Sequence, residues 1–278
     1  MSVLETERRD GIFVIRMNRP DRLNALGTEL RAALVEAWVE FRDSRELEVA
    51  IYTGTGRGFC VGEDMKESVA RGTVGGGSGG SGSGGGGGPM RDNPYMTGEI
   101  QKPIIAAING FAMGGGFMLA ERADLRVSVR AAVFEMSEVK RWLLGGFNHG
   151  HVNGLSHTVA TEMAFAFRFD AQRLYELGFL NRLVDDDQLM PASFEMAEHL
   201  MTLPPAARVN TLVMMRAMRP TVPPELQALA DRLREHGAQS DLMESRRAFA
   251  EKRKPNFVGW DDPEDRYRTP TLSAAPPR

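Results

Sequence analysis

The chain has 278 residues, of which 42% are hydrophobic and 26% are charged, and this is enough apolar sequence to bury one large core. Its formal net charge of -3 gives no overall electrostatic reason to bind nucleic acid or an anionic membrane, so an anionic ligand needs a local cluster of cations. The single cysteine, Cys60, excludes an internal disulfide, and the first residues lack the apolar core of a signal peptide. No stretch approaches the roughly 20 apolar residues of a membrane-spanning helix, so we expect a soluble, cytoplasmic protein.

The first part of the chain alternates apolar runs with a helical pattern. Short apolar runs predict buried strands over residues 12–17, 49–53 and 104–108. Residues 18–24 are polar and typical of a turn. Apolar residues then recur at helical spacing over residues 28–42, with Thr28 as the expected cap, and again over residues 117–123. This alternation favours an α/β fold.

Residues 75–88 consist only of glycine and serine. Such a composition cannot bury apolar surface, so it predicts a flexible surface loop. A natural low-complexity insertion and an engineered linker both agree with the pattern. A phosphate-binding role is not favoured, because a phosphate cradle is one short glycine turn fixed against the start of a helix.

After residue 168 the pattern becomes helical, with helices predicted over residues 172–177, 190–203, 206–218 and 224–252. We therefore divide the chain into a core over residues 1–195, a helical C-terminal region over 196–260 and a polar, Pro-rich tail over 261–278. The tail is expected to be extended or disordered unless a neighbouring subunit holds it. Methionines 190, 196, 201, 214, 215 and 218 are expected to fill core or subunit contacts.

Two loops, residues 57–67 and 109–117, carry glycines directly after a predicted strand and directly before a predicted helix. Without a side chain, glycine lets a ligand approach main-chain N–H groups, and the start of a helix directs those donors at negative charge. A GGG run alone more often marks close packing or a turn. Two such loops in this order can together form an oxyanion hole.

The segments RGFCVGEDMKE and KPIIAAINGFAMGGGFMLAERADLRV resemble the two oxyanion-hole loops of the enoyl-CoA hydratase/isomerase (crotonase) family. The likeness extends to IFVIRMNRPDRLNAL, FEMSEV, LGFLNRLV and FAEKRKPNF, and so to nearly the whole chain. It implies an α/β spiral of repeated strand-strand-helix units with a helical C-terminal trimerisation region, assembled as a homotrimer or hexamer. It also implies an acyl-CoA thioester substrate and no cofactor, since coenzyme A is part of the substrate.

By position, the resemblance assigns the backbone N–H groups of Glu63 and Gly115 to the oxyanion hole, where they would bond the thioester oxygen as it gains enolate charge. Glu63 stands where the family usually has a small residue, so we expect its carboxylate to point away from the site. A solvated loop acid is the alternative reading of this side chain. Asp64 matches a common family acid and is predicted to organise the loop.

Hydratases of this family typically use two glutamates, one as the base that activates a water and one as the acid that donates a proton. Here Met118 stands at the first position and can exchange no proton, whereas Glu138 in FEMSEV matches the second. Glu138 is therefore the predicted catalytic acid/base, with a surface loop glutamate as the alternative reading. A single carboxylate suffices to move a double bond, which favours isomerase-like chemistry, whereas hydration needs another polar group to position the water.

Three side chains are candidates for that auxiliary role. Glu121 lies one helical turn beyond Met118, and His149 and His151 lie in FNHGH, which replaces a glycine-rich segment of typical family members. Histidine titrates near neutral pH, although packing within a rebuilt loop is the favoured reading. The HxH spacing also suggests a metal site, but no third clustered ligand is evident and we expect no metal.

Substrate contacts are predicted at two further places. Phenylalanines 165, 167 and 169 replace a familiar LTG segment and either line a pocket for a bulky acyl chain or, as the favoured reading, pack in the protein interior. Lys66 and the run Lys252, Arg253 and Lys254 stand where the family offers cations to the phosphates of coenzyme A. A solvated helix end is the alternative for that run.

The sequence therefore predicts an enzyme of the hydratase or isomerase type that stabilises a thioester enolate. A non-catalytic acyl-CoA-binding homologue is an alternative, suggested by Met118 and the altered histidine loop. A hydrolase or lyase acting on a CoA ester is another. The acyl chain of the substrate is left open.

Overall fold

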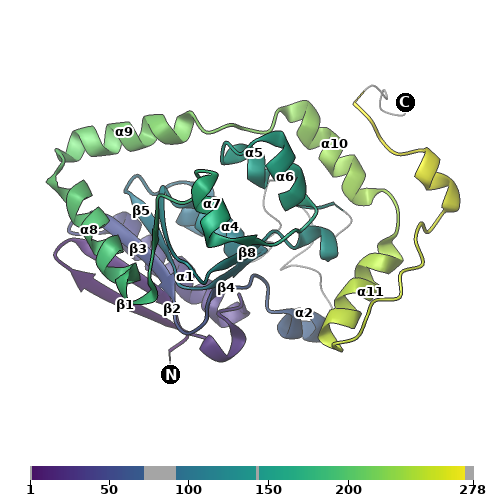
Figure 1. Cartoon of the computed structure of the whole chain (residues 1–278), viewed down its shortest axis with the longest axis horizontal. Helices are drawn as coiled ribbons and strands as arrows, with labels where there is room; N and C mark the ends of the chain where they lie inside the picture. The colour runs from purple at the N-terminus through teal and green to yellow at the C-terminus, as the bar shows by residue number, and fades with distance from the viewer. Residues whose placement is uncertain (1, 72–91, 142–143, 273–278) are drawn as a thin grey trace.

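The computed structural model describes residues 2–71, 92–141 and 144–272 (Figure 1). The glycine and serine run predicted to be flexible, residues 75–88, lies outside the described residues, as do the last six residues of the tail. The described part contains two sheets and a set of helices around and beyond them.

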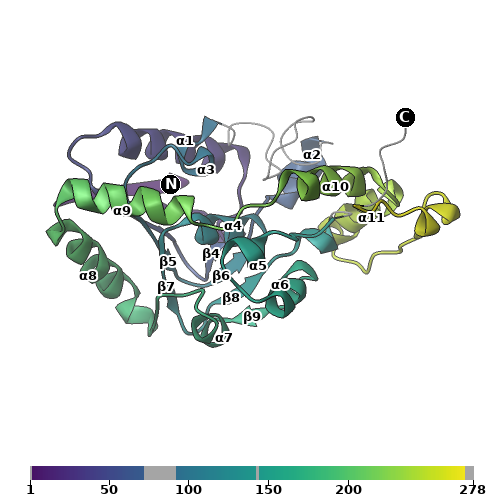
Figure 2. The same ribbon diagram turned by 90° about the horizontal axis from the view of Figure 1, so that it is seen from above.

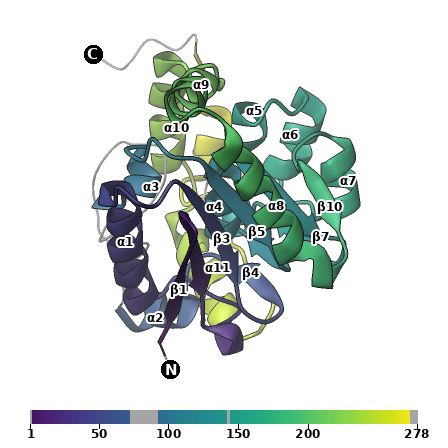
Figure 3. The same cartoon turned by 90° about the vertical axis from the view of Figure 1, so that its left-hand side faces the viewer.

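The larger sheet has six strands in the order β1-β2-β3-β5-β7-β10. They are β1 (Leu4–Arg9), β2 (Ile12–Met17), β3 (Val49–Gly54), β5 (Ile104–Ile108), β7 (Leu125–Val129) and β10 (Arg182–Val184). β1 pairs with β2 in the antiparallel sense, and the remaining pairs are parallel. Every residue of β3 and β5 is buried, as expected for parallel strands covered on both faces. Figure 3 shows these strands side by side.

The smaller sheet has the order β4-β6-β8-β9. Its strands are β4 (Gly58–Cys60), β6 (Phe111–Met113), β8 (Val133–Glu135) and β9 (Phe169–Asp170). The pairs β4–β6 and β6–β8 are parallel, and β9 joins β8 in the antiparallel sense.

Successive turns of the chain repeat one pattern, because β3, β5 and β7 belong to the larger sheet and each is followed by a strand of the smaller one. A helix comes next: α2 (Met65–Arg71) after β4, α4 (Gly115–Arg122) after β6, and the short 3-10 helix η3 (Glu138–Lys140) after β8. The expected spiral of strand-strand-helix units is thereby confirmed. Because β4, β6 and β8 are parallel, the helices that follow them start at the same edge of the smaller sheet.

The remaining helices frame the sheets. They are η1 (Pro20–Arg22), α1 (Thr28–Asp43), α3 (Pro94–Thr97), α5 (His149–Val152), α6 (His157–Ala164), α7 (Ala171–Glu176), η4 (Asp186–Gln188), α8 (Leu189–Thr202), α9 (Pro205–Ala217), α10 (Pro224–Glu235), α11 (Gln239–Ala250) and η5 (Pro263–Tyr267). Helix α1 packs on β1 and β2, and α8 packs on β3, β5 and β7. The predicted domain boundary at 195/196 falls inside α8, where Met196 and Ala197 are buried in the main core.

The start of α1 differs from the prediction that Thr28 is its cap. Thr28 lies inside the helix, and the N-cap position is Gly27, which has no side chain to accept a bond. The carboxylate of Glu67 on α2 takes this role instead, accepting from the Thr28 backbone N–H at 2.8 Å and from its hydroxyl at 3.2 Å. A long-range carboxylate therefore satisfies donors that helix starts leave open.

An aromatic cluster joins α1, α3 and the turn from β3 into β4. Trp38 stacks on Tyr95 with ring centroids 4.5 Å apart, and Tyr52 meets Trp38 edge-on at 5.3 Å. Phe59 on β4 meets Tyr52 at 5.4 Å. Pairs of this kind add about 0.5–1.5 kcal/mol each beyond their burial. The cluster fixes the place from which the first glycine loop departs.

The C-terminal helices extend from the core as an arm (Figure 2). The prediction of one helix over residues 224–252 is wrong, because α10 ends at Glu235 and α11 begins at Gln239. Gly237 lies between them with a φ of +104°, a left-handed conformation that favours glycine. The arm turns back there, and α11 packs against α2.

The methionines divide between core and surface. Met196 is buried, whereas Met214, Met215 and Met218 at the end of α9 are at least 60% exposed. Within the residues that the structure describes, no helix combines the length and apolar character needed to cross a membrane.

Candidate active site

The first glycine loop and the start of α4 lie against each other. A Cβ added to Gly62, whose φ is +82°, would lie 2.9 Å from the backbone nitrogen of Gly115. A Cβ on Gly116 would lie within 2 Å of the Cys60 carbonyl oxygen, at 1.9 Å. Neither position has room for a side chain, so glycine is required for this close approach. The two loops predicted to act together are therefore neighbours in space.

Two backbone N–H groups at this contact stay outside the hydrogen-bond ladders. Leu26 N–H donates to Gly62 O at 2.7 Å, and Asp64 N–H donates to Leu26 O at 3.4 Å. The N–H of Glu63, between Gly62 and Asp64, takes no part in this bridge. Gly115 is the first residue of α4 and has no acceptor within its own helix. Both donors belong to residues that adjoin the Gly62–Gly115 contact.

Asp64 holds the first loop in place. It is 4% exposed and forms an ion pair with Arg19 at 3.0 Å. Its other oxygen accepts from the backbone N–H groups of Lys66 and Glu67 at 3.2 and 3.4 Å. The prediction that Asp64 organises the loop is confirmed.

Glu63 is not the solvated loop acid considered from sequence. Its Oε1 is buried and has no hydrogen-bond partner among the described residues. Arg246 on α11 faces it: burial lowers the pKa of Arg246, and the charge of Glu63 opposes that shift. The C-terminal arm therefore reaches the first glycine loop, a long-range contact that the local sequence does not reveal.

Glu138 begins η3, directly after β8 and Met136–Ser137, and faces the glycine loop of α4. A Cβ on Gly114 would lie 3.8 Å from Glu138 Oε1, while Oε2 is buried without a hydrogen-bond partner among the described residues. Burial raises the pKa of Glu138, His149 lowers it in part, and Glu121 and Glu135 raise it further. A carboxyl group in this environment differs from a surface loop glutamate and suits proton transfer.

A second pair of titratable groups lies beside Glu138. Glu121 on α4 and His149 on α5 are both 8% exposed, and Glu121 Oε1 lies 2.5 Å from His149 Nδ1. Burial lowers the pKa of His149, but the carboxylates of Glu121 and Glu138 outweigh it, and the net shift is upward. The sequence suggested Glu121 and His149 separately, and the structure brings them together.

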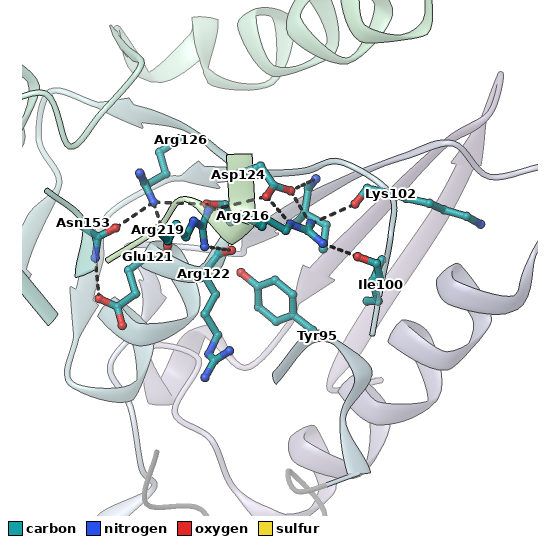
Figure 4. A network of polar contacts seen from close by, with 12 residues as sticks. Tyr95, Ile100, Lys102, Glu121, Arg122, Asp124, Arg126, Asn153, Arg216 and Arg219 are labelled. Atoms are coloured by element: carbon teal, nitrogen blue, oxygen red, sulfur yellow. Dashed lines mark hydrogen bonds and ion pairs between the residues drawn. The ribbon is translucent and has the colours of Figure 1, made fainter. Parts of the chain in front are cut away.

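Asn153 is a site residue that the sequence analysis missed. Its Nδ2 donates to Glu121 Oε2 at 2.9 Å and to the His149 carbonyl at 2.8 Å. Behind it, the Arg126 guanidinium donates to the Glu121 carbonyl at 2.9 Å and to Asn153 Oδ1 at 3.4 Å (Figure 4). Burial lowers the pKa of Arg126 to about 10. The spacing of Asn153 four residues after His149 is the signal that would have found it.

Comparison with known proteins identifies the family of the chain. Residues 7–260 match the family model described as enoyl-CoA hydratase/isomerase. The protein belongs to that family. Over 260 residues it is 32% identical to enoyl-CoA hydratase EchA19 of Mycobacterium tuberculosis, with 90% of this chain and 94% of that protein covered. It is 28% identical over 265 residues to 1,2-epoxyphenylacetyl-CoA isomerase of Escherichia coli, with 90% and 95% covered.

Solved structures agree with the family. Carnitinyl-CoA hydratase from Mycobacterium avium superposes with a TM-score of 0.75 at 27% identity, with 93% of this chain and 99% of that chain covered. A probable enoyl-CoA hydratase/isomerase from Mycobacterium abscessus gives a TM-score of 0.65 at 33% identity, with 92% and 98% covered. These neighbours have the crotonase fold described above.

Several predicted side chains lie apart from the Glu138 group in this family member. Met118 is partly buried against the hydrophobic core. His151 is exposed and stacks on His157 at 5.3 Å, so it does not join His149. Phe165 and Phe167 are 64% and 60% exposed, so the favoured reading that they pack in the interior is wrong. Only Phe169 of that trio is buried.

The predicted cations lie on elements that meet. Lys66 is exposed in the first turn of α2, and the run Lys252, Arg253 and Lys254 is exposed just after α11, which packs on α2. Arg253 is engaged within the chain, because it pairs with Glu244 at 2.5 Å and with Glu251 at 2.6 Å. Its guanidinium holds the pKa of Glu244 down to about 2. In the described part of the chain, no three His, Cys, Asp or Glu side chains are grouped as metal ligands.

Proposed function

We propose that this protein is an acyl-CoA hydratase or isomerase that stabilises a thioester enolate, with Glu138 as its catalytic acid/base. The observation that carries the proposal is the position of the Glu138 carboxylate, whose Oε2 is buried and whose Oε1 faces Gly114, one residue before the helix start that contacts the first glycine loop. Membership of the enoyl-CoA hydratase/isomerase family supports the CoA-thioester substrate.

The proposed oxyanion hole consists of the backbone N–H groups of Glu63 and Gly115. As a proton leaves or a nucleophile adds, negative charge develops on the thioester oxygen, and the two donors bond it. One donor of this kind is worth about 3 kcal/mol in a site shielded from water. Glu138 then removes a proton from one carbon or returns it to another.

The proposed contacts for the phosphates of coenzyme A are Lys66, Lys252 and Lys254. Arg253 is a further proposed contact, and its ion pairs with Glu244 and Glu251 fix its position next to the two lysines of the run. Coenzyme A enters as part of the substrate, so no separate cofactor is required. We also propose a homotrimer or a pair of trimers, since α9 presents Met214, Met215 and Met218 at the surface.

The test is to incubate the purified protein with 2-enoyl, 3-enoyl and aryl-substituted acyl-CoA esters and to follow each by ultraviolet absorbance and mass spectrometry. Gain of one water identifies a hydratase, and a shifted double bond without mass change identifies an isomerase. Release of free coenzyme A would instead identify hydrolase or lyase chemistry. Binding without any product would leave a non-catalytic acyl-CoA-binding protein and refute the proposal.

Glu138→Gln keeps the shape of the side chain but removes its proton transfer. We expect turnover to fall by about 10²- to 10⁴-fold, with little change in affinity for coenzyme A. Glu198→Gln on α8 is the matched control, because Glu198 is exposed and remote from the glycine loops. Turnover by Glu138→Gln at the rate of this control would remove Glu138 from its assigned role.

A further inference from the structure

Beyond Glu138, the site contains a carboxylate–imidazole pair. We infer that His149, positioned by Glu121, is the second proton-transfer group of the site and that the pair equips the enzyme for hydration. This inference rests on the function proposed above. Met118 stands at the position of the first of the two family glutamates and cannot transfer a proton. A histidine beside Glu138 would take over that proton transfer.

The contact between Glu121 and His149 gives the imidazole a defined orientation. Glu121 Oε1 lies 2.5 Å from His149 Nδ1, which places the shared proton on that side of the ring. The second nitrogen, Nε2, has no hydrogen-bond partner within the described residues. An imidazole held by a carboxylate at one nitrogen can accept or donate a proton at the other.

The surrounding chain is built around this ring. Asn153 bonds both partners, Glu121 through its side chain and His149 through its carbonyl. Gly146 leaves room for the ring, because a Cβ there would lie 2.6 Å from His149 Cδ2. Gly150 lets α5 pack closely on α6, because a Cβ there would lie 2.5 Å from the side chain of Ala160. A histidine that merely filled space would need neither the buried carboxylate nor this second anchor.

Glu138 and His149 are close enough for each charge to act on the other. His149 lowers the pKa of Glu138, and Glu138 raises the pKa of His149. The charged groups around them come from several elements: Glu121 and Arg122 on α4, Glu135 on β8, and Glu138 on η3. Negative charge prevails around His149, so the imidazolium is favoured beside an ionised Glu138.

This arrangement supplies both proton transfers of hydration. The Glu138 carboxylate takes a proton from water as the water oxygen bonds to C3 of the 2-enoyl thioester. The electron pair of the C2–C3 double bond then moves into the thioester enolate, whose oxygen the two backbone N–H groups bond. The His149 imidazolium gives its proton to C2, the thioester carbonyl re-forms, and the proton on Glu138 passes to His149 to restore the starting state.

The experiment compares the pH dependence of 2-enoyl-CoA hydration in the full-length wild type, His149→Gln, Glu121→Gln and the control His151→Gln. In the wild type, activity falls at low pH as Glu138 is protonated and at high pH as His149 loses its proton. We expect His149→Gln to lose about 10²- to 10⁴-fold in kcat and to lose the alkaline limb. Glu121→Gln should move that limb to lower pH, since it removes a carboxylate that raises the pKa of His149.

The control and the folding checks keep the outcomes distinct. His151→Gln should keep both limbs, because His151 is exposed and stacks on His157 away from Glu121. Thermal melting and affinity for coenzyme A establish that each variant folds. An unchanged alkaline limb in folded His149→Gln overturns this inference while Glu138→Gln still tests the proposed function. If the wild type turns over no substrate of the panel, the proposed function fails instead.

Discussion

Glu138 shows how a single residue is set apart by its surroundings. Its position in the chain and its match to a family glutamate made it a candidate from sequence. The burial of Oε2 and the neighbouring carboxylates come from other elements, so the local sequence could not supply them. The same holds for Glu121 and His149, whose contact joins residues 28 positions apart. Candidate residue types were therefore predictable, whereas their pairing required the fold.

The raised pKa of Glu138 has a consequence for stability. Because the folded-state pKa lies above the ordinary value of 4.5, the protonated form favours folding at low pH, and this contribution is lost as pH rises through the folded pKa. Glu138→Gln is neutral at every pH. We therefore expect the variant to gain in free energy of unfolding relative to the wild type as pH rises above 4.5 and through the folded-state pKa.

Urea denaturation of both proteins across that pH range measures the difference. Glu198→Gln, at an exposed position, should show no comparable pH-dependent gain. A wild type that becomes more stable than Glu138→Gln as pH rises would contradict the raised pKa.

At the scale of elements, the longer helices could be predicted from their periodicity and the buried strands β2, β3 and β5 from their apolar runs, but the smaller sheet could not. β4, β6 and β8 have three residues each and β9 has two, which is too short to show an alternating pattern. The family resemblance predicted their presence as the second strand of each repeat. The break between α10 and α11 was missed because Gly237 sits inside an otherwise continuous helical spacing.

An ion pair that could not be predicted from the sequence holds helix α9 against the core. Arg216 bonds both carboxylate oxygens of Asp124 at 2.8 and 2.7 Å, and the Asp124 side chain is 10% exposed (Figure 4). Because Arg216→Ala removes the two hydrogen bonds that Arg216 donates to this largely buried carboxylate, we expect a loss of about 2–3 kcal/mol in free energy of unfolding. The exposed ion pair of Arg130 and Asp185, with a 3.1 Å contact, is the control.

Chemical denaturation at neutral pH measures both variants. Arg130→Ala should cost less than about 1 kcal/mol, as surface ion pairs usually do. Equal losses in the two variants would show that burial of Asp124 adds nothing to the docking of α9.

At the scale of the whole molecule, a compact spiral carries an arm of helices that leaves the core with α9 and returns to it through α11 (Figures 1 and 2). The arm leaves large apolar side chains at the surface, including Met214, Met215 and Met218. Exposed apolar side chains gathered on one element are typical of a contact surface. The return of α11 to Glu63 and α2 could not be predicted from the local pattern.

We expect the protein to assemble as a trimer or hexamer through its C-terminal helices. Light scattering coupled to size exclusion should give three or six times the chain mass at micromolar concentration. Replacing Met214 and Met218 with Asp should shift the equilibrium toward smaller species, because charge would be buried in the contact. Asp at Leu272, exposed in the tail, is the control. A monomer at all concentrations would contradict this assembly.

The role of Glu138 is tested most directly by turnover of a 2-enoyl-CoA ester in deuterium oxide by the wild type and by Glu138→Gln, read by mass spectrometry. We expect the wild type to add heavy water with a deuterium at C2, and the variant to bind the ester but leave it unchanged. Either of two results would contradict this role. The wild type could bind the ester without adding water, moving its double bond or exchanging protons, or Glu138→Gln could be as active as the wild type.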